Sequence, residues 1–191
     1  MEQGEDSGTC RFGPVTIRPP DYVDITYVAA NMRAIDRREL TAISPVDDAL
    51  SIATLIWERS RGDTGETWGV YRGDQPVAMF GVALAHPGTY HGWMFGTRHT
   101  WRVVPAISRF RRVLERRLYK SGVQRVEARA LEENEMATRW LVSLGAQIEC
   151  RLPCFGKAGE PFVQLAWTRD NVLLLSAESR TAAARPASAA A

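Results

Sequence analysis

The amino-acid sequence predicts a single α/β domain, on three observations. Segments with apolar residues at helical spacing alternate with short runs rich in Val, Ile, Tyr and Trp, which are typical of strands. Of the 191 residues, 45% are hydrophobic, which is enough for a full core in a chain of one-domain length. Core formers are sparse at the ends: residues 1–11 are a polar arm, and residues 171–191 hold an apolar segment followed by an Ala/Ser-rich tail. The domain is therefore expected to span residues 12–170.

The first half of the domain is expected to contain a strand, two helices and a hairpin. Residues 13–19 are rich in strand formers and end at a Pro-Pro pair, which cannot continue a sheet. Residues 21–40 carry an apolar helical stripe behind a capping aspartate, and residues 45–57 carry a second one behind a proline. Residues 67–84 form two β-rich runs around a polar turn, which predicts a β-hairpin.

The second half predicts four strands and two helices. The clearest helix covers residues 101–122, where apolar residues recur at helical spacing, arginines occupy other positions and Gly122 ends the segment. A shorter helix is expected over residues 134–145, stopped by Gly145. The strands are expected at residues 88–97, 123–131, 146–152 and 161–169.

Composition and charge exclude several classes of protein. A net charge of +2 does not by itself indicate a nucleic-acid partner. No run of apolar residues reaches membrane-spanning length, and the acidic N-terminus lacks the features of a secretory signal, so the protein is expected to fold in the cytosol. Three cysteines and three scattered histidines do not make a disulfide framework or a metal site, so no metal is expected.

The segment from Asn134 to Ala146, NEMATRWLVSLGA, carries the most informative local pattern. Asn134 is followed three residues later by Ala137, and Leu144-Gly145 close the segment. Together with the order of elements and the hairpin DQPVAMFGV, this pattern resembles the GNAT (Gcn5-related N-acetyltransferase) superfamily over about residues 12–169. The resemblance implies a central mixed, mostly antiparallel sheet flanked by about four helices, and a site for acetyl-CoA.

Four short motifs, in this order along the chain, show a narrower likeness. NMRAIDRREL, PVAMFGV, WMFGT and TRWLVSLGA together look like a GNAT-like family from short-tailed bacteriophages, whose members include internal virion or morphogenesis proteins. This likeness implies other virion proteins as partners, at the portal, the tail or the internal core. It also implies a location in the virion or in the host cytoplasm.

The superfamily resemblance assigns cofactor-binding roles to four residues. In GNAT proteins a glycine-rich loop and a helix N-terminus cradle the pyrophosphate of the cofactor. The matching loop, GTRHTWRVVPA, has only Gly96, but Arg98 and Arg102 could attract phosphate. Asn134 would bond the pantetheine arm, although Asn is equally suited to be the N-cap of the following helix.

The proton-transfer groups depart further from the superfamily pattern. The tyrosine that stands seven residues after the Asn, and that protonates the leaving thiolate, is replaced by Leu141, which cannot donate a proton. Glu127, His91 and Glu66 are the candidates for the base that takes a proton from an amine. Each also has an ordinary explanation, since carboxylates on short strands and single histidines in turns commonly face solvent.

Three hypotheses about function follow, in this order. The first is a virion-assembly protein with a degenerate acetyltransferase site, and the second is an active acetyl-CoA-dependent N-acetyltransferase acting on a host or phage amine. The third is a basic module that binds nucleic acid, because six cationic residues cluster in one helix: Arg109, Arg111, Arg112, Arg116, Arg117 and Lys120. Glu115 suits local ion pairs among them, and no aromatics are interleaved, so a solvated helix face is favoured over specific nucleic-acid recognition.

Overall fold

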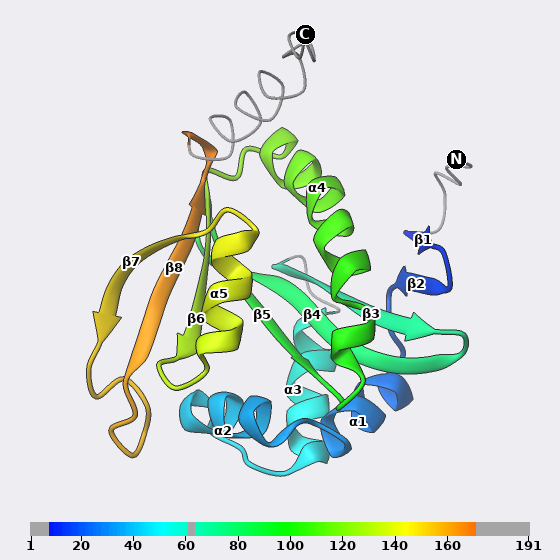
Figure 1. Ribbon diagram of the computed structural model, residues 1–191, viewed down its shortest axis with the longest axis horizontal. Coiled ribbons are helices and arrows are strands. Elements are labelled where there is room, and N and C mark those ends of the chain that lie inside the picture. Colours follow the sequence, from blue (N-terminus) through cyan, green and yellow to red (C-terminus); the bar gives the residue numbers. More distant parts are fainter. Residues whose placement is uncertain (1–7, 61–63, 171–191) are drawn as a thin grey trace, which may run out of the picture.

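The computed structural model describes residues 8–60 and 64–170, which form one sheet with helices on both faces (Figure 1). The sheet has eight strands in the order β1-β2-β3-β4-β5-β6-β8-β7. In chain order the strands are β1 (Cys10–Phe12), β2 (Val15–Arg18), β3 (Gly65–Arg72), β4 (Gln75–His86), β5 (Thr89–Gly96), β6 (Arg125–Leu131), β7 (Gln147–Leu152) and β8 (Phe162–Thr168). The pairing is antiparallel except between β5 and β6, as expected for a mixed, mostly antiparallel sheet.

Five α-helices and one short 3-10 helix accompany the sheet in the described residues. They are α1 (Tyr22–Ala30), α2 (Ala34–Ile43), α3 (Ala49–Ser60), the 3-10 helix η1 (Thr100–Arg102), α4 (Val104–Lys120) and α5 (Glu135–Ser143). Asp21 and Asp48 accept backbone N–H groups at the starts of α1 and α3, which confirms the expected helix starts. The predicted α/β class and the order of the main elements are therefore confirmed.

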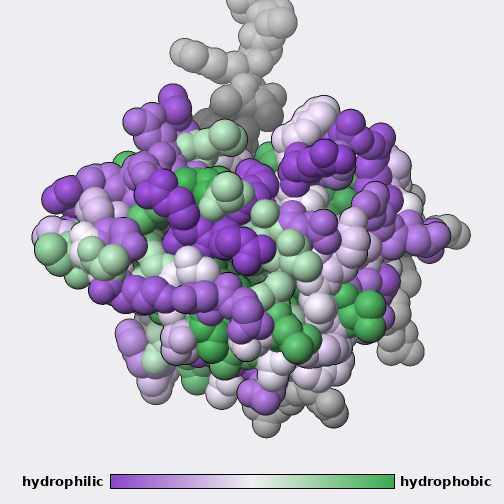
Figure 2. All heavy atoms as spheres, turned by 90° about the horizontal axis from the view of Figure 1, so that it is seen from below, coloured by the Kyte–Doolittle hydropathy of each residue, from purple (hydrophilic) through white to green (hydrophobic). Residues whose placement is uncertain are grey.

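The helices divide between the two faces of the sheet. On one face, Val103 and Phe110 of the α4 region pack with Val70 and Phe80 of β3 and β4. Helix α5 lies beside α4 on this face, against β6 and β8. On the other face, α1 and α3 pack against β4 and β5, and Ala42 of α2 packs against the end of β6. The side on which α2 lies mixes hydrophilic side chains with smaller hydrophobic patches (Figure 2).

The sheet opens between β5 and β6. These strands pair only from Thr89↔Arg125 to Gly92↔Ala128, and beyond that point they diverge. Alternation along β5 sends Tyr90 and Met94 toward α4 and sends Trp93 toward α1 and α3. The gap therefore connects the two faces of the sheet.

Helix α2 spans the open end of this gap with two carboxylates one turn apart. Asp36 Oδ2 accepts the backbone N–H of Gly96 at the end of β5, at 2.9 Å. Glu39 Oε2 accepts the backbone N–H of Leu131 at the end of β6, at 2.8 Å. Each carboxylate thus satisfies a backbone donor that the divergence of the strands leaves without a ladder partner.

The structure corrects the sequence prediction in two places. The single helix expected over residues 21–40 is two helices, because the chain turns at Met32, which forms a β-bridge with Thr97, and the backbone N–H of Arg33 donates to the carbonyl of Gly96. The sheet also begins earlier than the expected boundary at residue 12, since Cys10–Phe12 pair with β2. Residues 1–7 of the expected arm and the tail at 171–191 lie outside the described residues.

Gly81 on β4 has no free space for a side chain. A Cβ atom at this position would lie 2.5 Å from the backbone oxygen of Glu66 and 2.6 Å from the indole of Trp93. We expect Gly81→Ala to lower the free energy of unfolding by about 1–3 kcal/mol, because a backbone atom cannot move aside cheaply. The measurement is urea denaturation. The matched control is Gly92→Ala on the adjacent strand, where the nearest atoms lie at 3.7 Å, and an equal loss in both variants would contradict the packing argument.

Candidate active site

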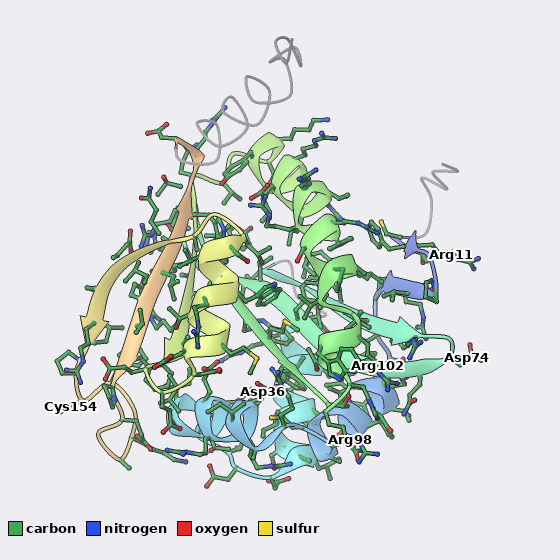
Figure 3. All side chains as sticks on the ribbon, viewed as in Figure 1. Arg11, Asp36, Asp74, Arg98, Arg102 and Cys154 are labelled. Atoms are coloured by element: carbon green, nitrogen blue, oxygen red, sulfur yellow. The ribbon has the colours of Figure 1, made fainter. Side chains whose placement is uncertain are left out.

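A cleft of about 420 Å³ crosses the sheet where β5 and β6 diverge. On one face it runs between α4 and α5, and on the other it reaches α2. Its walls are mostly apolar, from Met94, Ile107, Leu114, Ala130, Ala137 and Trp140 on the α4/α5 side to Leu40, Ile43 and Trp93 on the α2 side. Figure 3 shows Asp36 at the α2 end, between the helix and the strands. An apolar cleft with a few polar groups is the usual form of a small-molecule site.

His91 lies in the wall of this cleft, on the α2 face of the sheet. Its Nδ1 is buried and has no hydrogen-bond partner. Burial lowers the pKa of His91 below the usual 6.5, and the positive charges of Arg129 and Arg59 lower it further, while Glu127 opposes them. The lowered pKa therefore favours the neutral imidazole of His91 at pH 7, and its Nδ1 carries no hydrogen bond.

Glu127 lies next to His91 but is held by a polar network. The two residues are register partners across the parallel pair β5–β6. Gln164 Nε2 donates to Glu127 Oε2, and the guanidinium groups of Arg125 and Arg129 approach the carboxylate at 3.5 and 3.7 Å. Glu127 does not line the cleft, so its position suits an electrostatic neighbour of His91 better than a base that contacts a substrate. The other sequence candidate, Glu66, faces Arg117 at 3.3 Å and lies outside the cleft.

Asn134 lines the cleft and has both ends of its side chain engaged. Its Oδ1 accepts the backbone N–H of Ala137 at 3.3 Å, which makes it the N-cap of α5. Its Nδ2 donates to Glu39 Oε2 at 3.0 Å. Burial raises the pKa of Glu39 above its usual range, although the bonds from Asn134 and Leu131 oppose the shift.

The loop expected to hold phosphate lies at the start of α4. Its Thr100 and Val104 line the cleft, whereas Gly96, Arg98 and Arg102 do not. Figure 3 labels Arg98 and Arg102. The N–H of Gly96 is already bonded to Asp36, and a Cβ at Gly96 would lie 2.1 Å from Thr100 Oγ1. Gly96 therefore serves close packing inside the loop. Arg98 and Arg102 are exposed, and the Arg102 guanidinium lies 5.1 Å from the centre of the exposed Trp101 ring.

Three hydrogen-bond donors on the α4/α5 side were not predicted from the sequence as site residues. Arg111 Nε, Tyr119 Oη and Trp140 Nε1 are buried without partners, and all three residues line the cleft. Arg111, Glu115 and Tyr119 share one face of α4 because they are four residues apart. That spacing was a usable signal, since it separates Arg111 from its exposed neighbours Arg109 and Arg112. The expected ion pair within the helix is confirmed between Arg111 and Glu115, at 2.6 Å.

Leu141 lies in the same wall, among hydrocarbon. It packs with Ala130, Ala146 and Leu165 where α5 covers β6 and β8. The position that the resemblance gives to a proton-donating tyrosine is thus an apolar contact. The phenol of Tyr119 lines the same cleft, and burial raises its pKa to about 12.

Other types of site are not formed by the described residues. Residues 8–60 and 64–170 contain no group of three His, Cys, Asp or Glu side chains that could hold a metal ion. Within the same ranges, no helix combines the length and apolarity needed to cross a membrane. All three cysteines are free, and Cys150 and Cys154 are exposed.

Comparison with known proteins identifies the fold. No protein-family model and no curated protein matches the sequence. A protein of T. thermophilus assigned as an acetyltransferase superposes with a TM-score of 0.70 at 15% identity, covering 91% of this chain and 95% of that one. A protein of Chromobacterium violaceum ATCC 12472, described as a probable acetyltransferase of the GNAT family, gives 0.66 at 14% identity, with coverage of 88% and 95%. The ribosomal-protein-S5-alanine acetyltransferase of Vibrio fischeri gives 0.63 at 13% identity, with coverage of 85% and 97%. The chain therefore has the fold of the GNAT acetyltransferases.

Proposed function

We propose that the protein transfers an acyl group from a coenzyme A thioester to an amine. The observation that carries the proposal is the cleft that crosses the sheet, because it lets two reactants approach one point from opposite faces. On the α2 face a neutral imidazole, His91, can take a proton from an amine. On the α4/α5 face an apolar channel can hold the thioester arm of the donor.

The residues of this channel fit the pantetheine arm of coenzyme A. That arm is a flexible chain with two amide groups, and it needs apolar walls with a few hydrogen-bond partners. The buried donor Trp140 Nε1 can bond an amide oxygen. Phosphates would lie near Arg98 and Arg102 at the start of α4, since guanidinium groups and helix N-termini attract anions. Asn134, the N-cap at the start of α5, also lines the channel.

The proposed mechanism assigns few chemical steps to the residues of the chain. His91 accepts a proton as the amine nitrogen bonds to the acyl carbon. The bond between that carbon and sulfur then breaks, and the thiolate of coenzyme A leaves with the bonding electron pair and takes up a proton from His91 or from solvent. The side chains of α2 close the cleft on the amine side, where Asp36 and Glu39 fix the ends of β5 and β6. Binding both reactants at one point supplies the advantage of proximity.

A second candidate function is binding by the same fold without acyl transfer. The N–H of Gly96 and the amide of Asn134 are used internally, and Leu141 replaces the proton donor, as in a degenerate site. These observations support a binding role without acyl transfer. The sequence resemblance would place that role in virion assembly, with portal, tail or internal core proteins as partners, in the virion or the host cytoplasm. The cleft and His91 favour the enzyme.

Calorimetric titration with coenzyme A and acetyl-CoA separates the two candidates. We expect saturable micromolar binding, because the channel is already formed. Ala137→Phe, which fills the channel from α5, should weaken binding by about tenfold or more, a loss of about 1.4 kcal/mol. Val142→Phe on the exposed side of the same helix is the control and should bind normally. A folded protein that binds neither ligand at millimolar concentration would overturn the enzyme proposal and leave the assembly role.

A further inference from the structure

The cleft continues past the point where β5 and β6 close. The last paired residues are Gly92 and Ala128, yet the cavity wall also includes Val126 and Trp167, which belong to the paired part of the sheet. Tyr119 near the end of α4 lines it too. The α4/α5 side thus contains an extension beyond the gap. An acetyl group at the gap would leave this extension empty.

The extension combines an apolar wall with donors that have no acceptor. Leu114, Leu118 and Val126 give hydrocarbon surface. Arg111 Nε and Tyr119 Oη are buried with no partner, and burying such donors without an acceptor is unfavourable. A ligand that fits both features has a hydrocarbon stretch ending in hydrogen-bond acceptors.

Arg111 defines the chemistry of those acceptors. Its Nη1 already binds Glu115 Oε1 at 2.6 Å and the carbonyl of Leu144, which fixes the orientation of the guanidinium group. The Nε–H remains unpaired, and Nε with the adjacent Nη forms the edge on which arginine binds carboxylates. Arg169 adds a second positive charge close enough to act on Tyr119.

We propose that the acyl donor is a coenzyme A thioester of a short dicarboxylic acid, whose distal carboxylate binds Arg111 and Tyr119 under α4. The proposal rests on the proposed function, which places the thioester carbon at the gap. From Gly92 and Ala128 to Val126 is two strand residues, or about 6.6 Å, a span suited to an acyl chain of about four or five carbons. In the transfer the carbon–nitrogen bond forms and the carbon–sulfur bond breaks, and the distal carboxylate is unchanged.

Glu115 is compatible with a second carboxylate in this place. Burial raises the pKa of Glu115, while Arg111 and Arg112 oppose the shift. A raised pKa makes protonation of Glu115 less costly than that of a free carboxyl group, so Glu115 can remain beside Arg111 when an anionic acyl group arrives. The guanidinium group of Arg111 therefore keeps the orientation that Glu115 and Leu144 fix.

The test compares three thioesters with the full-length protein and one amine: acetyl-CoA, butyryl-CoA and succinyl-CoA, the last two with equal carbon counts. Thiol release is followed after subtraction of the rate without protein. We expect kcat/KM for succinyl-CoA to exceed that for butyryl-CoA by about tenfold or more, in line with a charge-assisted hydrogen bond. Calorimetry with the same thioesters gives a readout that does not depend on turnover.

Two variants assign the preference to its residues. Arg111→Met should remove the succinyl-over-butyryl ratio, and Tyr119→Phe should reduce it about threefold or more. Tyr119→Phe deletes a buried hydroxyl without a partner, so its melting temperature should not fall. Equal binding and turnover of all three thioesters would overturn the inference and leave the proposed function standing. Failure of every thioester to bind would overturn both.

Discussion

Replacing Asp36 by alanine is expected to lower the free energy of unfolding by about 2–3 kcal/mol. Asp36 is only 5% exposed, and its two oxygens accept from Arg33 at 2.7 and 2.8 Å. The same carboxylate accepts the N–H of Gly96. The variant leaves a buried backbone donor unpaired and a guanidinium without its partner, although the 32% exposure of Arg33 moderates the loss. Urea denaturation of both proteins measures the difference.

Asp47→Ala is the matched control for Asp36→Ala. Asp47 also makes an ion pair, with Lys157 at 2.6 Å, but its side chain is 70% exposed. Surface pairs of this kind contribute about 0–1 kcal/mol, so the control should stay close to the parent protein. If the two variants lost equal stability, the attachment of α2 to β5 would not be the source of the effect.

Asp36→Ala should also act on the cleft. The carboxylate fixes the end of β5, as Glu39 fixes the end of β6, and together they hold the two strands apart at the open end of the gap. The width of the cleft is therefore set by α2 as well as by the sheet. A loosened α2 would alter the shape of the cleft on the α2 face, where the amine is proposed to enter.

Local periodicity was sufficient to predict most of the helices and strands. The hairpin β3–β4, the long α4 and the short α5 follow from patterns that extend over several residues. The break between α1 and α2 could not be found this way, because Met32 and Arg33 leave the helix to bond Thr97 and Gly96, more than sixty residues away. Such long-range backbone contacts leave no trace in a helical stripe.

The site was harder to predict than the fold. His91 and Asn134 were named from the sequence and do line the cleft. Asp36, Glu39 and Arg111 were missed, because each lies in a segment of mixed charge where an exposed helix face is the usual explanation. The spacing of Arg111, Glu115 and Tyr119 was the one usable signal for α4, whereas only the three-dimensional arrangement separates the carboxylates of α2 from their solvated neighbours.

His91→Gln is expected to lower the rate of acyl transfer by about 10²- to 10⁴-fold, which is the contribution of a positioned base. Glutamine keeps much of the size and polarity of the side chain but cannot accept the amine proton. Binding of coenzyme A should be unaffected, because His91 lies on the α2 face and the donor arm on the other. Steady-state kinetics and calorimetry on the same preparations provide both readouts. His86→Gln is the matched control, since His86 is exposed at the end of β4 and lies outside the cleft.

The pH dependence distinguishes a base from a packing residue at this position. Burial lowers the pKa of His91 below 6.5, so kcat should stay constant through neutral pH and fall only below pH 6.5. An arylamine acceptor is suitable for measuring this profile because its nitrogen is already neutral over the pH range.

The lowered pKa of His91 also affects folding stability. Below pH 6.5 the unfolded chain takes up the proton first, so folding stability is lost as the pH falls toward the folded-state pKa. His91→Gln should remove both the acid limb of kcat and this part of the stability loss. A variant that lost the stability term but kept the full rate would assign His91 to packing alone, and the search for the base would move to its neighbour Glu127.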